Sequence, residues 1–415
     1  MAKKKKKKIC PKQQEAEHRK AFLRKINDLA LRLGVEDFTA GMSPALQRNM
    51  FDLRMRGVTV VSESPAITPT VMKEIKEYQG QLLRRLEVEL TEGGTSVTIL
   101  EMLTIAQSLY YFLKTEDEVK DNAELQTVFA DFLHWLGTEK EPYGRLDDVL
   151  WFATTNWCEL THRLYWLTHS FRVEDYRIYN EFKLDTVQAE QRRLRLEGHT
   201  RAVYRVGWAL PDYGPHWASV KASLFGNSST AGEEELPVFV QSHALRRLEE
   251  RLDCTERHSQ QYHLYLSLQE PHVVKGPNGK WLIRYRFKEL HLGYLVADVV
   301  DGILVLRTFL FITMDSTPEG RALQEALGLA AVDKKYLAID RLSTFLISDI
   351  AEHPDLKEHF LKAGCDDLFV FDTTAVLPEH RLELGDRIRN YLDTGLEQQM
   401  LASEVPSEEP QEAMV

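Results

Sequence analysis

The pair Asp301–Gly302 constrains the fold more than any other feature of this sequence. It separates two long segments rich in β-branched and aromatic residues, 290–300 and 303–314. An Asp-Gly pair in that setting favours the two-residue turn with positive φ that closes an antiparallel hairpin. Two further strand candidates come just before it, 271–275 and 280–288, joined by the turn sequence GPNGK. Since consecutive strands usually pair with each other, the sequence predicts a four-stranded antiparallel meander.

The hairpin also predicts a register and two sheet faces. A two-residue turn pairs Val300 with Ile303 and Val296 with Arg307, and places Asp298 diagonally from Arg307, within reach of a salt bridge. Side chains alternate along a strand. One face is therefore expected to be wholly apolar and to carry Leu295, Ala297, Val299, Leu304, Leu306, Leu310 and Ile312. The other is expected to carry Tyr294, Asp298, Arg307, Phe309 and Phe311.

The first half of the chain has a different pattern. From about residue 14 to residue 197, apolar residues recur almost throughout at the spacing of an amphipathic helix. Ser43 and Thr68 each precede a proline, which is a typical helix start. We expect helices at 43–57, from Thr68 to about 90, and at 97–114, 122–136, 146–170 and 174–197.

Together these patterns predict an α+β protein. A chain of 415 residues is too long for one ordinary core. We expect a mainly α domain at 14–197, and a connector at 198–237 with short strands and an acidic linker. A meander packed on helices follows at 238–400, with a helical extension that begins at the helix cap Thr317. The lysine-rich residues 1–13 and the acidic residues 401–415 are expected to be disordered.

Charge limits the partners. The net charge is −11, and removing the seven lysines of residues 1–12 leaves −18 for the rest. Such a body repels phosphate backbones, so nucleic acid would need a local basic patch. No apolar run of membrane-spanning length occurs, so no membrane partner is expected. The scattered cysteines favour a reducing cytoplasm; they are Cys10, Cys158, Cys254 and Cys365.

The helix predicted at 241–254 and the strand at 280–288 carry the residues best suited to chemistry. On a helical wheel Leu245, Leu248 and Leu252 share the core side. The opposite side carries His243, Arg247, Glu250 and Cys254, which also fits an ordinary solvated face. In the strand, one side carries Arg284, Arg286 and Lys288. A basic strand face near aromatic residues is typical of sheets that bind single-stranded RNA.

The segment SHALRRLEER (242–251) and the meander ending in LRTFLFIT (306–313) resemble the small bacterial domains related to the RelE and BrnT ribonuclease toxins. The motif residues here are His243, Ala244, Arg247, Glu250 and Arg251, with Ser242 directly before the histidine. The resemblance covers roughly residues 238–314. It implies a ribonuclease that works without a metal or another cofactor, with His243 as general acid–base.

The same resemblance implies that Arg247, Arg284 and Arg307 hold the scissile phosphate. We therefore expect His243, Arg247 and Arg307 to be catalytic, and the strand faces to bind RNA through Arg284, Arg286, Lys288 and Tyr294. No metal site is expected, because the groups Cys158–His162 and Cys254–His258–His263 lack further ligands that could complete one. The alternative is a non-enzymatic scaffold, whose helical domain binds a protein partner.

Overall fold

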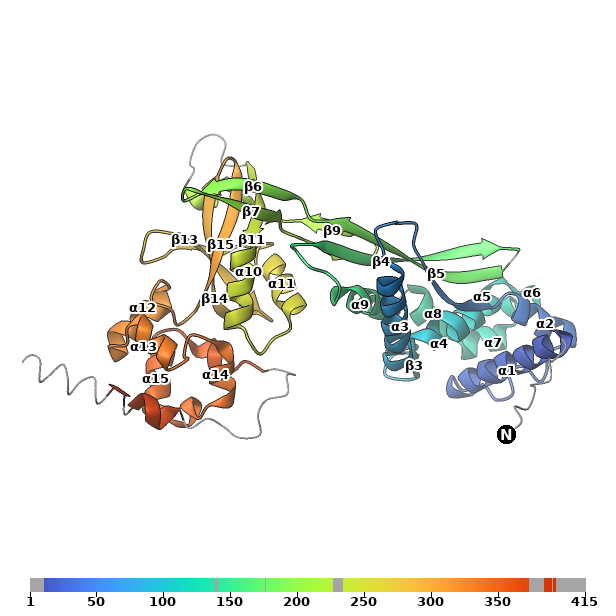
Figure 1. Cartoon of the computed structure of the whole chain (residues 1–415). Helices are drawn as coiled ribbons and strands as arrows, with labels where there is room; N and C mark the ends of the chain where they lie inside the picture. The colour runs from blue at the N-terminus through green and yellow to red at the C-terminus, as the bar shows by residue number, and fades with distance from the viewer. Residues whose placement is uncertain are drawn as a thin grey trace, which may run out of the picture. The chain divides into compact units, whose positions relative to one another are not determined.

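The computed structural model describes residues 11–138, 141–175, 177–226, 234–372, 384–389 and 391–392. The chain divides into two compact units, each of which makes most of its contacts within itself (Figure 1). Unit 1 consists of residues 1–158, 164–187 and 209–215. Unit 2 consists of residues 159–163, 188–208 and 216–415. Helices dominate the first unit and a large sheet the second, so the predicted α+β class is confirmed.

The helices of unit 1 begin where the sequence predicts. The side chains of Ser43 and Thr68 cap their helices by accepting hydrogen bonds from Leu46 N and Val71 N. Its helices are α1 (Pro11–Arg32), α2 (Pro44–Asp52), α3 (Pro69–Arg85), α4 (Ile99–Glu101), a π-helical turn (Met102–Ala106), α5 (Gln107–Thr115), α6 (Asp117–Lys120), α7 (Ala123–Val128), α8 (Ala130–Thr138) and α9 (Glu141–Thr155).

Unit 1 also contains strands where helices were expected. A three-stranded sheet has the order β1-β5-β4, and β2 pairs with β3. The strands are β1 (Met55–Val61), β2 (Glu87–Glu89), β3 (Ser96–Thr98), β4 (Arg163–Glu174) and β5 (Arg177–Gln188). The predicted helices at 43–57, 146–170 and 174–197 are therefore wrong over these residues. Their apolar residues alternate: Phe182 and Leu184 are buried between more exposed Glu181, Lys183 and Asp185, which is the period of a strand.

The expected connector is more structured than predicted. Its short strands are β7 (His199–Arg205), β8 (Gly207–Leu210), β9 (Gly214–Trp217) and β10 (Ser219–Lys221). Part of the predicted acidic linker, residues 227–233, lies outside the described residues. Its last residues, however, belong to a strand, β11 (Glu235–Gln241). The structure therefore joins β7, β10 and β11 to the sheet of unit 2, while β8 and β9 pair with each other.

The sheet of unit 2 has eight strands. Seven follow the order β12-β13-β14-β15-β11-β7-β6, and β10 also pairs with β11. The predicted meander is confirmed as β12 (Val273–Lys275), β13 (Trp281–Phe287), β14 (Leu290–Val300) and β15 (Ile303–Phe311). Strand β11 lies parallel to β15 and antiparallel to β7, and β6 (Gln191–Leu196) forms the edge.

A β-bulge changes the predicted register of the central hairpin. Val300 pairs with Ile303 as expected, but Val296 pairs with Thr308 and Ala297 with Leu306. Arg307 is thus the extra residue of a bulge. From this point the faces of β15 are exchanged, so the buried Phe309 lies opposite Leu295 and the expected purely apolar face is not continuous.

Helices cover the sheet and continue beyond it. They are α10 (Ser242–Arg251), α11 (Arg257–Leu266), α12 (Pro318–Leu327), α13 (Ala331–Tyr336), α14 (Leu342–Ile347) and α15 (Pro354–Lys362), with 3₁₀ turns at Ala222–Phe225, Ile350–Glu352 and Asp366–Phe369. Thr317 caps α12 as predicted. The tails predicted to be disordered lie outside the described residues, apart from 11–13, which are the start of α1. Among the described residues, no helix has the length and apolar character needed to span a membrane.

Candidate functional site

The strand β11 ends earlier than its neighbours, and this leaves a cleft in unit 2. Its last residue, Gln241, pairs with Val203 of β7, and the chain then turns directly into α10. Strands β7 and β15 both extend past this point. The resulting β11 cleft has a volume of about 860 Å³ and is lined by Thr161, Leu196, Glu197, His199, Arg201, Ala202, Gln241, Ser242, His243, Leu245, Arg246, Glu249, Arg257, Lys280, Val296, Asp298, Arg307 and Thr308.

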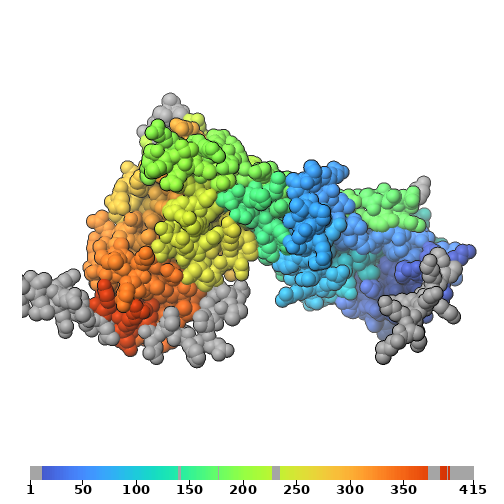
Figure 2. Space-filling view, viewed as in Figure 1, coloured from blue at the N-terminus to red at the C-terminus, as the bar shows by residue number. Residues whose placement is uncertain are grey.

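The hairpin β6–β7 forms one wall of the β11 cleft. Glu197 and Gly198, at its tip, both have positive φ, which is typical of a two-residue hairpin turn. Leu196 and Val203 on its inner face pack against Phe239 of β11, so the hairpin is fixed to the sheet. In the space-filling view its green surface adjoins the yellow surface of residues 240–270 (Figure 2).

Positive charge is concentrated in the β11 cleft of this acidic protein. Five cationic side chains line it, with three carboxylates and two histidines; the cations are Arg201, Arg246, Arg257, Lys280 and Arg307. Arg257 is already held by Glu159 and Glu249, each at 2.6 Å. Lys280 is 3.9 Å from Asp298. The cleft therefore has more positive than negative groups, which suits an anionic ligand.

Arg307 lies at the bulge of β15 and points into this cluster. Its Nη1 donates to Asp298 Oδ2 at 2.7 Å, which confirms the predicted salt bridge. Its Nη2 is 3.3 Å from Glu197 Oε2, at the tip of the hairpin. The Nε atom is buried without a hydrogen-bond partner. The side chain is only 16% exposed, so its orientation is set by these two carboxylates.

His243 is the second residue of α10 and is partly buried. Burial lowers its pKa, and the positive charges of Arg247 and Arg246 lower it further. Arg246 Nη2 lies 3.0 Å from His243 Nδ1. Because a guanidinium can only donate, Nδ1 accepts this bond, and the neutral ring carries its hydrogen on Nε2.

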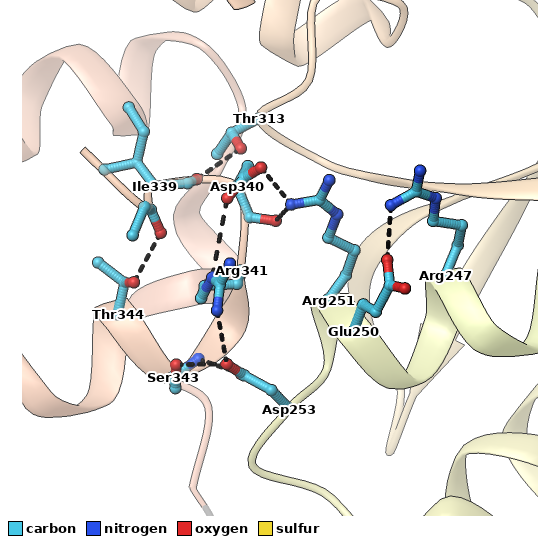
Figure 3. Close-up of polar contacts among 11 residues, drawn as sticks. Arg247, Glu250, Arg251, Asp253, Thr313, Ile339, Asp340, Arg341, Ser343 and Thr344 are labelled. Atoms are coloured by element: carbon cyan, nitrogen blue, oxygen red, sulfur yellow. Dashed lines mark hydrogen bonds and ion pairs between the residues drawn. The ribbon is translucent and has the colours of Figure 1, made fainter. Parts of the chain in front are cut away.

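The other residues of the motif do not line the β11 cleft. Ala244, a residue of α10, is fully buried. Arg251 forms a buried ion pair with Asp340, and Asp253 accepts hydrogen bonds from Ser343 (Figure 3). Figure 3 also shows Arg247 paired with Glu250 on the same helix. Arg247 Nη1 is 2.6 Å from Glu250 Oε2. Arg247 does not line the β11 cleft and is near His243 only as a charge.

The four residues expected to bind RNA lie elsewhere in unit 2. Tyr294 is 1% exposed, and its hydroxyl donates to Glu319 at 2.8 Å. Arg284 is opposite Tyr294 on the neighbouring strand. Arg286 pairs with Glu289 at 3.3 Å, and Lys288 is at the turn between β13 and β14 with positive φ. None of the four lines the β11 cleft. The structure therefore places His243 and Arg307 in one cleft, and the four residues expected to bind RNA outside it.

Sequence reasoning missed several residues of the β11 cleft, namely His199, Arg201, Arg246 and Lys280. Arg201 and His199 were missed because a helix was expected at 174–197 and a connector after it, so no hairpin was predicted there. The alternation in RRLRLEGHTRAVYR, with a glycine at its centre, is the signal that predicts the hairpin. Lys280 and Arg246 had no local signal, because only the tertiary fold brings them to the cleft.

Among the described residues, no group of three or more His, Cys, Asp or Glu side chains is placed to hold a metal ion. Cys158 and His162, considered as part of one helix, instead lie in the turn after α9. Comparisons with protein-family models, curated proteins and solved structures found no match to this chain. The β11 cleft therefore has to be interpreted from its own chemistry.

Proposed function

We propose that unit 2 binds single-stranded RNA in the β11 cleft and cleaves it without a metal ion, in a reducing cytoplasm. The observation that carries the proposal is the position of His243. It lies beside Arg246, in a cleft that is also lined by Arg307, a residue from a distant segment of the chain. A titratable base next to guanidinium groups is suited to reactions at a phosphate.

RNA is the ligand that best fits the balance of charge. The chain as a whole is acidic, so binding must be local, and the cations of the β11 cleft form the local site. Arg201 has no ion pair among the described residues, and Arg246 is near only one carboxylate, Glu250, at 3.8 Å. These two guanidinium groups can form paired hydrogen bonds with phosphate oxygens at little cost.

The proposed reaction is attack by a ribose 2′-hydroxyl on the neighbouring phosphorus. When Arg246 turns to the phosphate it frees Nδ1 of His243, which then takes the 2′-hydroxyl proton. The new 2′-O–P bond forms as the P–O5′ bond breaks. The departing oxygen takes a proton from water, and the hydroxide so formed takes the proton that His243 had accepted. The products are a 2′,3′-cyclic phosphate and a 5′-hydroxyl end. Arg307 stabilises the charge that develops on the phosphate oxygens.

The test is incubation of a short single-stranded RNA with the whole protein in EDTA. The wild type should produce cyclic-phosphate ends, and His243→Ala should reduce the rate at least about a hundredfold, the usual contribution of a general base. Arg246→Gln and Arg307→Gln should weaken RNA binding. Arg321→Gln removes an exposed arginine of α12 whose one ion-pair partner among the described residues is Glu325, and it should change neither.

The outcomes separate binding from catalysis. Equal cleavage by wild type and His243→Ala would assign the activity to other residues or to a contaminant. Binding that Arg246→Gln weakens, without cleavage, would leave an RNA-binding protein. No binding and no cleavage would reject the proposal.

One observation favours the alternative of a non-enzymatic scaffold. Arg307 and Arg257 are each held by two carboxylates of the same chain, as expected for groups whose role is to stabilise a fold. In that case partner binding through the helices of unit 1 would be the function. Substitutions in the β11 cleft would then change stability and leave partner binding intact.

A further inference from the structure

We propose that the outer face of the hairpin β6–β7 binds the part of a single-stranded RNA that extends beyond the β11 cleft. The outer face consists of Gln191, Arg193, Arg195, Thr200, Ala202 and Tyr204. The inference rests on the proposed function, because it takes the ligand to be an RNA strand held in the cleft. It adds that the protein favours RNA longer than the cleft itself can hold.

Strand alternation divides the hairpin into an inner and an outer face. Leu194 and Leu196 are on the inner face, where they pack in the apolar cluster that contains Phe239. Arg193 and Arg195 alternate with these leucines, so their side chains lie on the outer face, and both are exposed. Strand β6 is also the edge strand of the sheet (Figure 1). The outer face is therefore open to a ligand.

The hairpin segment 190–205 is basic, although the chain as a whole is acidic. It contains five arginines and two glutamates, Glu190 and Glu197. Glu190 pairs with two arginines of the inner face, Arg192 at 2.7 Å and Arg205 at 4.0 Å. Glu197 is 3.3 Å from Arg307. Both carboxylates of the segment are thus paired with arginines that are not on the outer face.

Arg193 and Arg195 have the spacing that an RNA backbone requires. Neither forms an ion pair within the part of the chain that the structure describes. Two positions along a strand correspond to about 7 Å, which is close to the separation of successive phosphates in an extended single strand. Guanidinium groups form paired hydrogen bonds with phosphate oxygens. These two arginines therefore suit two consecutive phosphates.

The outer face continues into the β11 cleft. Arg193 pairs across the hairpin with Ala202, which lines the cleft. Arg195 pairs with Thr200, whose neighbours on both sides in the chain also line the cleft. With a volume of about 860 Å³, the cleft has room for only a few nucleotides. A longer strand that leaves it along the hairpin meets these arginines, and the acidic remainder of the protein disfavours other paths.

The experiment measures, by calorimetry, binding of a non-cleavable 2′-O-methyl RNA dodecamer and of a trinucleotide to the whole protein. The double variant Arg193→Gln/Arg195→Gln should weaken dodecamer binding roughly tenfold at low salt, because two phosphate contacts are lost. Its slope of log affinity against log salt concentration should be smaller by about 1.4, since each phosphate contact to a single strand contributes about 0.7. Trinucleotide binding should not change, because the trinucleotide lies within the cleft.

The matched control is Arg192→Gln. It removes the same charge from the same strand, but Arg192 is on the inner face, where it pairs with Glu190 and lies 4.8 Å from the ring centre of Phe239. This variant should bind both RNAs as the wild type does. If Arg192→Gln weakens dodecamer binding as much as Arg193→Gln or Arg195→Gln alone, the effect is one of general charge and the inference is overturned.

Charged side chains on an edge strand also prevent sheets from associating with one another. Light scattering separates this role from RNA binding. Self-association of the double variant, with an unchanged affinity for the dodecamer, would assign Arg193 and Arg195 to protection of the edge and overturn the inference. Melting temperatures close to that of the wild type would show that all variants are folded.

Arg246→Gln, in the β11 cleft, distinguishes this inference from the proposed function. Weakening of both RNAs by Arg246→Gln, and of the dodecamer alone by the double variant, supports both. Dodecamer binding that depends on the double variant but not on Arg246 supports the outer face and rejects the cleft as the RNA site. Binding that depends on Arg246 alone overturns the inference and leaves the proposed function. If the wild type binds neither RNA, both are rejected.

Discussion

His243 is the one residue of the motif H-A-x-x-R-x-x-E-R that lines the β11 cleft. Its neighbours on α10 determine its properties. Arg246 contacts its ring, and Arg247 lowers its pKa through charge alone. A lowered pKa keeps the imidazole neutral at physiological pH, which is the form a general base requires.

The pKa of His243 should be measured directly by an NMR titration of its ring protons. We expect a value below the ordinary 6.5, because burial and two arginines disfavour the charged ring. Arg247→Gln removes one of these charges and should raise the pKa. Cleavage needs the neutral ring, so the rate should rise with pH through this pKa, and the rise should move to higher pH in the variant. An unchanged pKa in Arg247→Gln would contradict the assigned cause.

Glu197 competes with an anionic ligand for Arg307. It is 72% exposed at the hairpin tip, while Asp298 holds Arg307 from the other side. Glu197→Gln should therefore leave Arg307 in place and raise RNA affinity by up to about fivefold, in line with an exposed ion pair. Fluorescence anisotropy with a labelled single-stranded RNA measures this effect. A fall in affinity would mean that Glu197 supports the bound state.

At the scale of elements, the two ends of α10 have different roles. Its start borders the β11 cleft, and its end is attached to residues 340–343 through Arg251 and Asp253 (Figure 3). The side chains of Arg251 and Asp340 are 12% and 6% exposed. Those of Arg247 and Glu250 are 41% and 43% exposed. The same residue type thus stabilises the fold at one position and remains near the surface at the other.

Arg251→Met should lower the free energy of unfolding by about 3–5 kcal/mol, because it leaves the carboxylate of Asp340 buried without its main partner. Arg247→Met, on the same helix, should cost about 0.5 kcal/mol or less, since its ion pair is exposed to solvent. Urea denaturation of both variants tests the difference. Equal losses would show that the Arg251–Asp340 pair is not the anchor of α10.

At the scale of the whole molecule, the division of the chain does not follow its order. Residues 188–208 belong to unit 2, although they precede a segment of unit 1. Strand β11 is paired with β15 on one edge, and with β7 and β10 on the other. The meander is therefore only part of the sheet on which the β11 cleft depends.

A fragment of residues 238–400, the boundary that the sequence suggests, should aggregate or unfold. It lacks β6, β7 and β10, so one edge of β11 and the apolar surface of Phe239 lose their cover. A fragment of residues 188–400 retains these strands and should melt cooperatively when followed by circular dichroism. Cooperative melting of the shorter fragment would show that the meander folds without the hairpin.

The sequence by itself determined the features that depend on neighbouring residues. The hairpin at Asp301–Gly302, the Asp298–Arg307 salt bridge and the capped start of α12 were all predictable, because turn residues, strand alternation and helix caps act over a few positions. The helices expected at 146–170 and 174–197 were wrong over the strands β4, β5 and β6, because the alternation of apolar residues there was overlooked.

Only the tertiary structure decided which of these residues meet. The bulge at Arg307, the parallel pairing of β11 with β15 and the approach of Glu197 to Arg307 join segments that are far apart in the chain. The same is true of the buried pair Arg251–Asp340, 89 positions apart. Strand order and burial arise from packing of the whole chain, and no local pattern encodes them. The β11 cleft exists because one strand ends while its neighbours continue.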